Sequence, residues 1–309
     1  FQLISSLKGD NAKILSVFSG EELTINQHIN SGNHILLLGS FSQKLSVKDK
    51  RIKSKSDKSL FVAKTSTSGD VTWVKTLDFV GQVTDVSLDL NEDNEAIVVG
   101  VYDDVISSDG LQIESDENSS NIFVTKFSEN GDLQSLDSID SGQNSTLEGF
   151  TLRQNGDLVI FARSNEKEVE IYDLNPAGQL NESMKLSVTE GNLDLNGFES
   201  FEEGIILGGD FSGELKIDGF SEANSSNACA FMMKLDGELN KVLLKSFSAS
   251  DFSSLSSLTL DFWGDPIVAI EYEGNLTSEF GFSNLEDNKN IVLSLIRNDD
   301  FQILWTKDL

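Results

Sequence analysis

A unit of four short strand-like segments recurs along the chain, and no other feature constrains its fold as strongly. The best copy lies in residues 33–77. In the good copies the second segment ends with a glycine two positions before an aromatic residue, as in Gly39-Ser40-Phe41, Gly100-Val101-Tyr102 and Gly209-Asp210-Phe211. Repetition over several tens of residues is typical of chains that stack similar units side by side, such as propellers and solenoids.

Two further markers keep a fixed order within the unit. The third segment opens with a phenylalanine shortly before a turn glycine, as Phe61 does before Gly69. The fourth segment carries a tryptophan in the first copy, at Trp73, and again in the last copy, at Trp305. Because three independent markers share one register, we expect the two tryptophans to occupy equivalent positions of fourth strands.

The segments between the markers have the composition of strands joined by tight turns. They are rich in Val, Ile, Leu and Phe, and Gly, Asn or Asp stands at nearly every connection, as hairpin turns require. No helical pattern separates the copies. The sequence therefore predicts an all-β protein, a β-propeller of short four-stranded antiparallel blades. We expect about six blade positions, from five full repeats plus a half repeat at the N-terminus.

Because the repeats fill the whole chain, we predict a single β-propeller domain over residues 1–309. The expected repeats are about 1–18 (partial), 22–77, 83–139, 147–186, 193–247 and 255–309. The third repeat is short because it lacks much of the excursion between its second and third strands. We therefore expect this excursion to be a surface element that the core does not need.

The first copy has glycine, aromatic and basic residues in a distinctive order, namely Gly39, Phe41, Leu45, Phe61, Val62, Ala63, Lys64, Gly69, Asp70, Trp73 and Lys75. This order resembles the SBBP-type β-propeller repeat of bacterial extracellular proteins. A second match runs from Gly209 to Leu215, whereas the copy around 159–186 departs from the pattern. The resemblance implies a propeller scaffold and a secreted or cell-surface location, and it implies no active site.

The charge of the chain excludes some classes of partner. The formal net charge is −28, so nucleic-acid binding is not expected, because phosphate contacts need clustered Lys and Arg. No apolar run is long enough for membrane insertion. The chain starts at Phe1 rather than Met, and we expect a secretion signal to have been removed. The single cysteine, Cys229, permits no intrachain disulfide and is expected to be a buried apolar residue.

One acidic turn has the spacing of a calcium loop. Asp89, Asn91 and Asp93 supply oxygen atoms at alternate positions. The glycine and the bidentate glutamate of such a loop are missing, because Asn94 and Gly100 stand at their places. Ordinary turn chemistry also explains the pattern, since the segment joins two strands. We expect no cofactor other than this possible Ca²⁺ ion.

The excursion of the first copy is basic in an otherwise acidic chain. The candidate binding residues are Lys48, Lys50, Arg51, Lys53 and Lys55. Such a patch fits an acidic surface on another copy of the protein, in a head-to-tail contact that need not close. An anionic surface glycan is the competing partner, and a solvated loop without a partner is the simplest alternative.

The sequence offers no catalytic arrangement. It contains no nucleophile elbow and no phosphate-binding glycine loop, and its two histidines, His28 and His34, leave little capacity for a general base. We therefore predict a chain that is not an enzyme but a non-catalytic extracellular binding or structural module, which mediates adhesion or assembly. The alternative is a propeller-fold glycoside hydrolase or other carbohydrate-active enzyme that uses two carboxylic acids.

Overall fold

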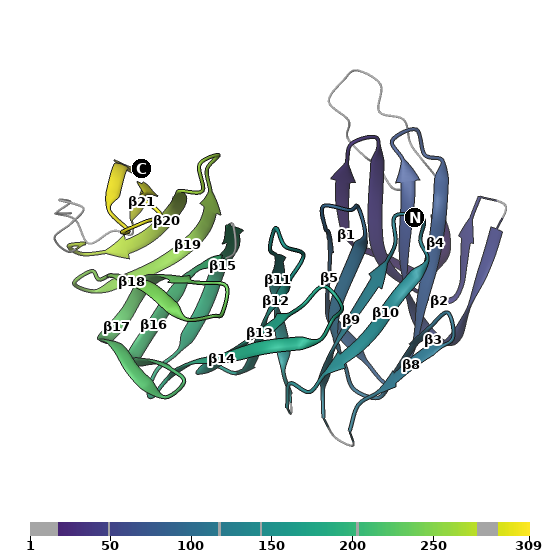
Figure 1. Cartoon of the computed structure of the whole chain (residues 1–309), viewed down its shortest axis with the longest axis horizontal. Coiled ribbons are helices and arrows are strands. Elements are labelled where there is room, and N and C mark those ends of the chain that lie inside the picture. Colours follow the sequence, from purple (N-terminus) through teal and green to yellow (C-terminus); the bar gives the residue numbers. More distant parts are fainter. Residues whose placement is uncertain (1–17, 49, 117–118, 143, 202–203, 277–289) are drawn as a thin grey trace. The chain divides into compact units, whose positions relative to one another are not determined.

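The computed structural model describes residues 18–48, 50–116, 119–142, 144–201, 204–276 and 290–309. These residues form β-strands and turns and contain no helix, so the prediction of an all-β protein is confirmed (Figure 1). It follows that no helix among them could span a membrane. The predicted half repeat at 1–18 lies outside the described residues except for Phe18.

The chain divides into two compact units, Phe1–Leu147 and Glu148–Leu309. The first unit contains two antiparallel sheets. One has the order β1-β2-β3-β4-β7-β8, and the other the order β10-β9-β6-β5. Their strands are β1 (Phe18–Ser31), β2 (His34–Val47), β3 (Lys50–Ser66), β4 (Val71–Val80), β5 (Val83–Leu90), β6 (Ala96–Tyr102), β7 (Val105–Ser108), β8 (Leu111–Glu114), β9 (Asn121–Phe127) and β10 (Leu133–Ile139).

The second unit holds the other two sheets. An eight-stranded sheet has the order β11-β12-β13-β14-β16-β17-β18, with β15 also paired to β16, and a four-stranded sheet has the order β19-β20-β21-β22. Their strands are β11 (Thr146–Leu152), β12 (Leu158–Asn165), β13 (Glu168–Leu174), β14 (Leu180–Val188), β15 (Leu193–Phe201), β16 (Gly204–Ile217), β17 (Phe220–Leu235), β18 (Lys241–Phe247), β19 (Phe252–Leu260), β20 (Pro266–Glu273), β21 (Asn290–Ile296) and β22 (Ile303–Asp308).

Five four-stranded antiparallel meanders are contained in these sheets, one for each full repeat. They are β1-β2-β3-β4, β5-β6-β9-β10, β11-β12-β13-β14, β15-β16-β17-β18 and β19-β20-β21-β22. The predicted repeats 22–77, 83–139, 147–186, 193–247 and 255–309 each overlap one of these meanders. Closure of the meanders into one propeller domain of about six blades stays a prediction.

The excursion between second and third strands consists of paired strands in the first, second and fourth repeats. In the first repeat β2 and β3 pair on as far as Val47 and Lys50, and in the fourth repeat β16 and β17 pair as far as Ile217 and Phe220. In the second repeat the excursion is the separate hairpin β7–β8. A hydrogen-bonded ladder satisfies the backbone polar groups that a loop would leave to water.

These excursions also join consecutive repeats. The end of β4 pairs with β7 of the following repeat, and the end of β14 pairs with the outer part of β16. Between the fourth and fifth repeats, the described residues form a bridge from Ala249 to Leu276. By contrast β10, whose following repeat has the short excursion, is an edge strand of its sheet. The excursion is therefore dispensable for a meander but extends the sheet from one meander to the next.

Cationic side chains also connect consecutive repeats, by donating hydrogen bonds to backbone carbonyl oxygens. Lys64 Nζ donates to the carbonyl oxygen of Glu129 at 3.4 Å, in the β9–β10 turn of the next repeat. In unit 2, Arg153 Nη1 donates to Gly237 O at 2.9 Å, and Lys234 Nζ to Asn298 O at 3.3 Å. All three acceptors lie in the turn between third and fourth strands. The lysine of the repeat motif is thus a contact between neighbouring meanders.

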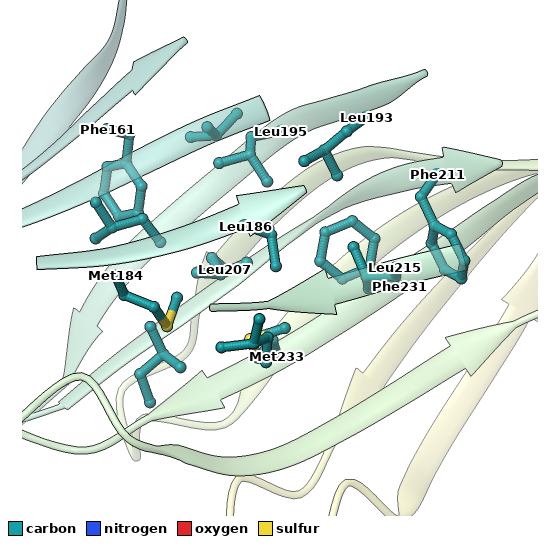
Figure 2. Close-up of a cluster of buried hydrophobic side chains, with 14 of the residues drawn as sticks. Phe161, Met184, Leu186, Leu193, Leu195, Leu207, Phe211, Leu215, Phe231 and Met233 are labelled. Atoms are coloured by element: carbon teal, nitrogen blue, oxygen red, sulfur yellow. The ribbon is translucent and has the colours of Figure 1, made fainter. Parts of the chain in front are cut away.

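Each unit has apolar clusters between and within its sheets. Figure 2 shows the largest cluster of unit 2, to which Phe161 of β12, Leu207 and Phe211 of β16 and Phe231 of β17 belong. Cys229 is 1% exposed and belongs to this cluster, which confirms the expectation of a buried apolar residue. In unit 1 the motif glycine Gly39 lies against the ring of Phe61, and a Cβ atom there would approach the ring to 2.6 Å.

Candidate functional site

The basic residues predicted from the sequence lie on one extended hairpin of unit 1. We call residues 44–48, at the end of β2, together with residues 50–55 of β3 the basic hairpin. Its inner face is apolar and includes the buried residues Leu45 and Val47. On β3 the outward residues Arg51, Lys53 and Lys55 are exposed and alternate with partly buried ones. Because alternate residues of a strand share a face, these three cations project to the same side.

The structure separates the five candidate cations into two groups. Lys48 Nζ lies 2.7 Å from Asp70 Oδ1, and Lys55 Nζ lies 3.8 Å from Asp78 Oδ2. The remaining three, Lys50, Arg51 and Lys53, form no ion pair with any described residue. They are therefore the part of the predicted patch that is available to a partner.

One further cation adds to this face. Lys44 on β2 is exposed and lies directly opposite Lys53 in the register of the hairpin. Like charges that face each other across strands destabilise a sheet by a few tenths of a kcal/mol or more. An anionic partner would remove that repulsion, so this arrangement favours a surface that binds anions over a merely solvated one.

The predicted calcium residues Asp89, Asn91 and Asp93 lie in and beside the turn between β5 and β6. Asn91 Oδ1 accepts backbone hydrogen bonds from Asp93 at 3.1 Å and from Glu95 at 2.9 Å. Asp89 Oδ1 accepts from the backbone of Leu90, and burial raises the pKa of the Asp89 carboxyl. The amide of Asn91 thus closes the turn, as asparagine commonly does.

A glutamate of this turn pairs with a lysine of the protein. Glu95 Oε2 lies 2.5 Å from Lys126 Nζ on β9. Burial acts to raise the pKa of Glu95, but hydrogen bonds from Lys126 and Asn91 outweigh it and lower the pKa. Within the part of the chain that the structure describes, no group of three or more His, Cys, Asp or Glu side chains is arranged around a metal site. Calcium binding stays a prediction.

A second surface was not predicted, and it lies in unit 2 at the turn between β19 and β20. We call Asp261–Asp265 the aromatic turn. Its two aromatic side chains are almost fully exposed, Phe262 at 94% and Trp263 at 82%. Their rings are perpendicular, with centroids 5.9 Å apart. Exposed aromatic residues of this size are common anchors of protein interfaces and ligand sites.

Hydrogen bonds hold the aromatic turn in place. Asp261 Oδ1 accepts from the backbone N–H of Trp263 at 2.8 Å and of Asp265 at 2.9 Å. Asp265 Oδ1 in turn accepts from the backbone N–H of Asn298 at 2.8 Å, and Asn298 Nδ2 donates to Gly264 O at 3.0 Å. The two aromatic rings are therefore exposed on a rigid turn, which lowers the entropy lost on binding.

The aromatic turn borders a groove of about 620 Å³ within unit 2, which we call the acidic groove. Its size falls in the range of ligand pockets, roughly 300–1,000 Å³. Four carboxylates and one ammonium group line it, from Glu199, Asp261, Asp265, Asp299 and Lys234. The ammonium is already engaged, since Lys234 Nζ lies 4.6 Å from the centroid of the Phe201 ring and donates to Asn298 O. The groove therefore favours cationic over anionic ligands.

One signal in the sequence could have revealed this surface. The other repeats have small polar residues in the equivalent turn, such as Gly32 and Asn33, Asn94, or Gly156. Only the fifth repeat places Phe262 and Trp263 there, where they cannot contribute to strand pairing. In the other repeats this turn consists of residues such as glycine and asparagine. A pair of large aromatic residues there departs from the repeat pattern and favours a functional role over a packing role.

Comparison with known proteins gives neighbours by structure alone. No family model and no curated protein matches the sequence. A protein of unknown function from Bacteroides caccae aligns with 93% of this chain and 82% of its own, at 10% identity and a TM-score of 0.40. Puromycin hydrolase aligns at 13% identity and a TM-score of 0.42, and Pyrococcus horikoshii acylaminoacyl peptidase at 10% and 0.32.

These alignments cover 87% and 89% of this chain but 46% of the hydrolase and 58% of the peptidase, so the chain spans about half of each enzyme. The prediction that the chain is not an enzyme is contradicted by these two neighbours, and we withdraw it. At such TM-scores no activity is transferred from them to this chain. The resemblance to the SBBP-type repeat has no matching family model and stays a prediction.

Proposed function

We propose that this chain is a binding and structural module of a secreted or cell-surface protein, built on a β-propeller scaffold of the SBBP type. In this proposal it mediates adhesion or assembly, and its partner is another copy of the same protein bound head-to-tail. The observation that supports the proposal best is the basic hairpin, which exposes unpaired cations in a chain of formal net charge −28.

The competing partner of the same hairpin is an anionic surface glycan. Both partners would neutralise Lys44, Arg51 and Lys53, and both contacts would weaken as salt rises, because exposed charges are screened over about 10 Å at 0.1 M salt. Self-association has the additional support that the rest of the molecule supplies many carboxylates. We therefore propose self-association as the main interaction.

The test compares two variants by sedimentation velocity at low and high salt. The first changes the unpaired cations Lys50, Arg51 and Lys53 to Gln, and adding Lys48→Gln and Lys55→Gln extends it to the full predicted patch. The control removes exposed lysines elsewhere that form no ion pair with a described residue, with the changes Lys167→Gln and Lys307→Gln. We expect the parent and the control to associate at low salt and the hairpin variant to sediment as a monomer.

Two results would contradict the proposal. A parent protein that is monomeric at low salt and high concentration excludes self-assembly. If parent and hairpin variant also bind an anionic glycan such as heparin equally well, the hairpin has no binding role and is only solvated. The alternative function, a carbohydrate-active enzyme, predicts release of reducing ends from polysaccharides by the same sample. Turnover that persists in the hairpin variant would favour that alternative.

A further inference from the structure

We infer that the acidic groove of unit 2 is the receptor for the basic hairpin of a second copy of the chain. The inference rests on the proposed self-association and names the surface that completes it. Each copy would then offer one hairpin and one groove, two different surfaces. A contact between unlike surfaces is heterologous, so it extends into a chain of molecules unless the rotation closes it into a ring.

Charge complementarity is the first reason for this pairing. The hairpin has unpaired cations at Lys50, Arg51 and Lys53, and the groove has carboxylates whose only cation, Lys234, already binds Asn298 O. Asp299 in the groove is exposed and forms no ion pair with a described residue. Complementary potentials speed association and fix its orientation.

The aromatic turn is the second reason, because it adds a contact that charge alone does not provide. A guanidinium or ammonium group over the face of an aromatic ring is stabilised by the ring quadrupole, and tryptophan is the best such ring. Phe262 and Trp263 present perpendicular faces at the border of the groove. The chain already makes this contact internally, where Lys234 Nζ lies over the ring of Phe201.

The shapes are also compatible. Arg51 and Lys53 project from one face of β3 and are two positions apart, which places them about 7 Å from each other along the strand. A groove of about 620 Å³ holds long side chains from one strand rather than a whole hairpin. We therefore place the outward side chains of β3 in the groove, with Arg51 or Lys53 against Trp263.

The experiment uses two complementary variants of the full chain. The hairpin variant carries Lys50→Gln, Arg51→Gln and Lys53→Gln, and the groove variant carries Trp263→Ala and Asp299→Lys. Both variants change exposed side chains, so we expect them to fold. Circular dichroism and the melting temperature check that they do. The control for the groove variant is Phe220→Ala with Glu92→Lys, which makes the same kinds of change at exposed positions outside the groove.

Sedimentation velocity at low salt then gives a distinctive pattern. We expect the parent and the control to form species larger than a dimer, and each variant alone to associate at least about tenfold more weakly. An equimolar mixture of the two variants should form a one-to-one dimer that does not extend. The intact hairpin of the groove variant can enter the intact groove of the hairpin variant, and no second contact remains.

The outcomes separate this inference from the proposed function. If the hairpin variant is monomeric while the groove variant associates like the parent, self-association stands and the groove is not its receptor. A mixture of variants that stays monomeric beside an associating parent also overturns the inference. Binding of the neutral probe maltohexaose that Trp263→Ala abolishes, with association unchanged, would assign the groove to glycans instead. A monomeric parent overturns both proposals.

Discussion

Trp73 and Trp305 occupy the same register of the first and last repeats, yet their surroundings differ. Trp73 pairs with Lys64 on β3, and Trp305 pairs with Leu295 on β21, so the predicted equivalence is confirmed. Trp73 is 9% exposed, whereas Trp305 is 47% exposed.

The difference comes from the following meander. Trp73 Nε1 donates to Glu129 O at 3.0 Å in the next repeat, and its ring packs on Gly131 and Phe127 of that repeat. Trp305 lies on β22, the edge strand of its sheet. The comparison shows that strand register is encoded within a repeat, whereas the burial of the tryptophan in that repeat depends on the meander that packs against it.

The largest expected effect tests this comparison directly. Trp73→Ala should lower the free energy of unfolding of unit 1 by about 3–5 kcal/mol, because it removes a buried ring and the hydrogen bond to Glu129 O. Trp305→Ala should cost less than about 1 kcal/mol, since nearly half of that residue is exposed. Calorimetry of the full-length variants measures both changes, and equal losses would show that the two environments do not differ.

A smaller effect is expected on the other side of the same contact. Gly131 has φ +86°, and a Cβ atom there would lie 2.7 Å from the Trp73 ring. Gly131→Ala should destabilise by about 1–3 kcal/mol, through backbone strain and this clash. The control Gly110→Ala has a similar φ, +92°, but an open environment, and therefore carries only the strain.

The same pair sharpens the comparison through a double mutant. In Trp73→Ala the clash at Gly131 disappears, so the double variant should lose less stability than the sum of the two single losses. Strictly additive losses in thermal unfolding would mean that the ring and the turn do not contact each other.

The smallest effect concerns an ion pair near the junction of β14 with β16. Lys185 Nζ lies 2.9 Å from Glu168 Oε1, and this hydrogen bond lowers the pKa of Glu168. A lowered folded-state pKa stabilises the protein above the unfolded value, about 4.3, and the contribution is lost as pH falls through the folded value. Glu168→Gln should therefore cost less than about 1 kcal/mol near pH 7 and nothing in acid.

The melting temperatures of the parent and of Glu168→Gln, measured from pH 7 down into acid, give the size of this effect. The gap between the two should close on acidification, while Glu92→Gln, an exposed change without an ion pair among the described residues, should show no gap. A gap that widens in acid would contradict the assigned direction of the pKa shift.

The candidate sites were predictable only in part. Composition located the basic hairpin, because seven Lys and Arg between positions 44 and 58 contrast with the acidic chain. It did not predict that Lys48 and Lys55 bind Asp70 and Asp78, because those partners are far from them in the sequence. The acidic groove was missed for the same reason, since its lining comes from separate repeats.

The sequence by itself determined the all-β class, the strand-rich segments and the turns between them. These depend on local interactions, namely apolar strand residues, the positive φ of turn glycines such as Gly69 and Gly178, and pairing between adjacent segments. Tertiary structure decided which surfaces are buried. The excursions became strands because they extend the sheet of a neighbouring meander, and Trp73 became buried while Trp305 did not. Burial depends on what packs against a strand, and residues distant in sequence supply it.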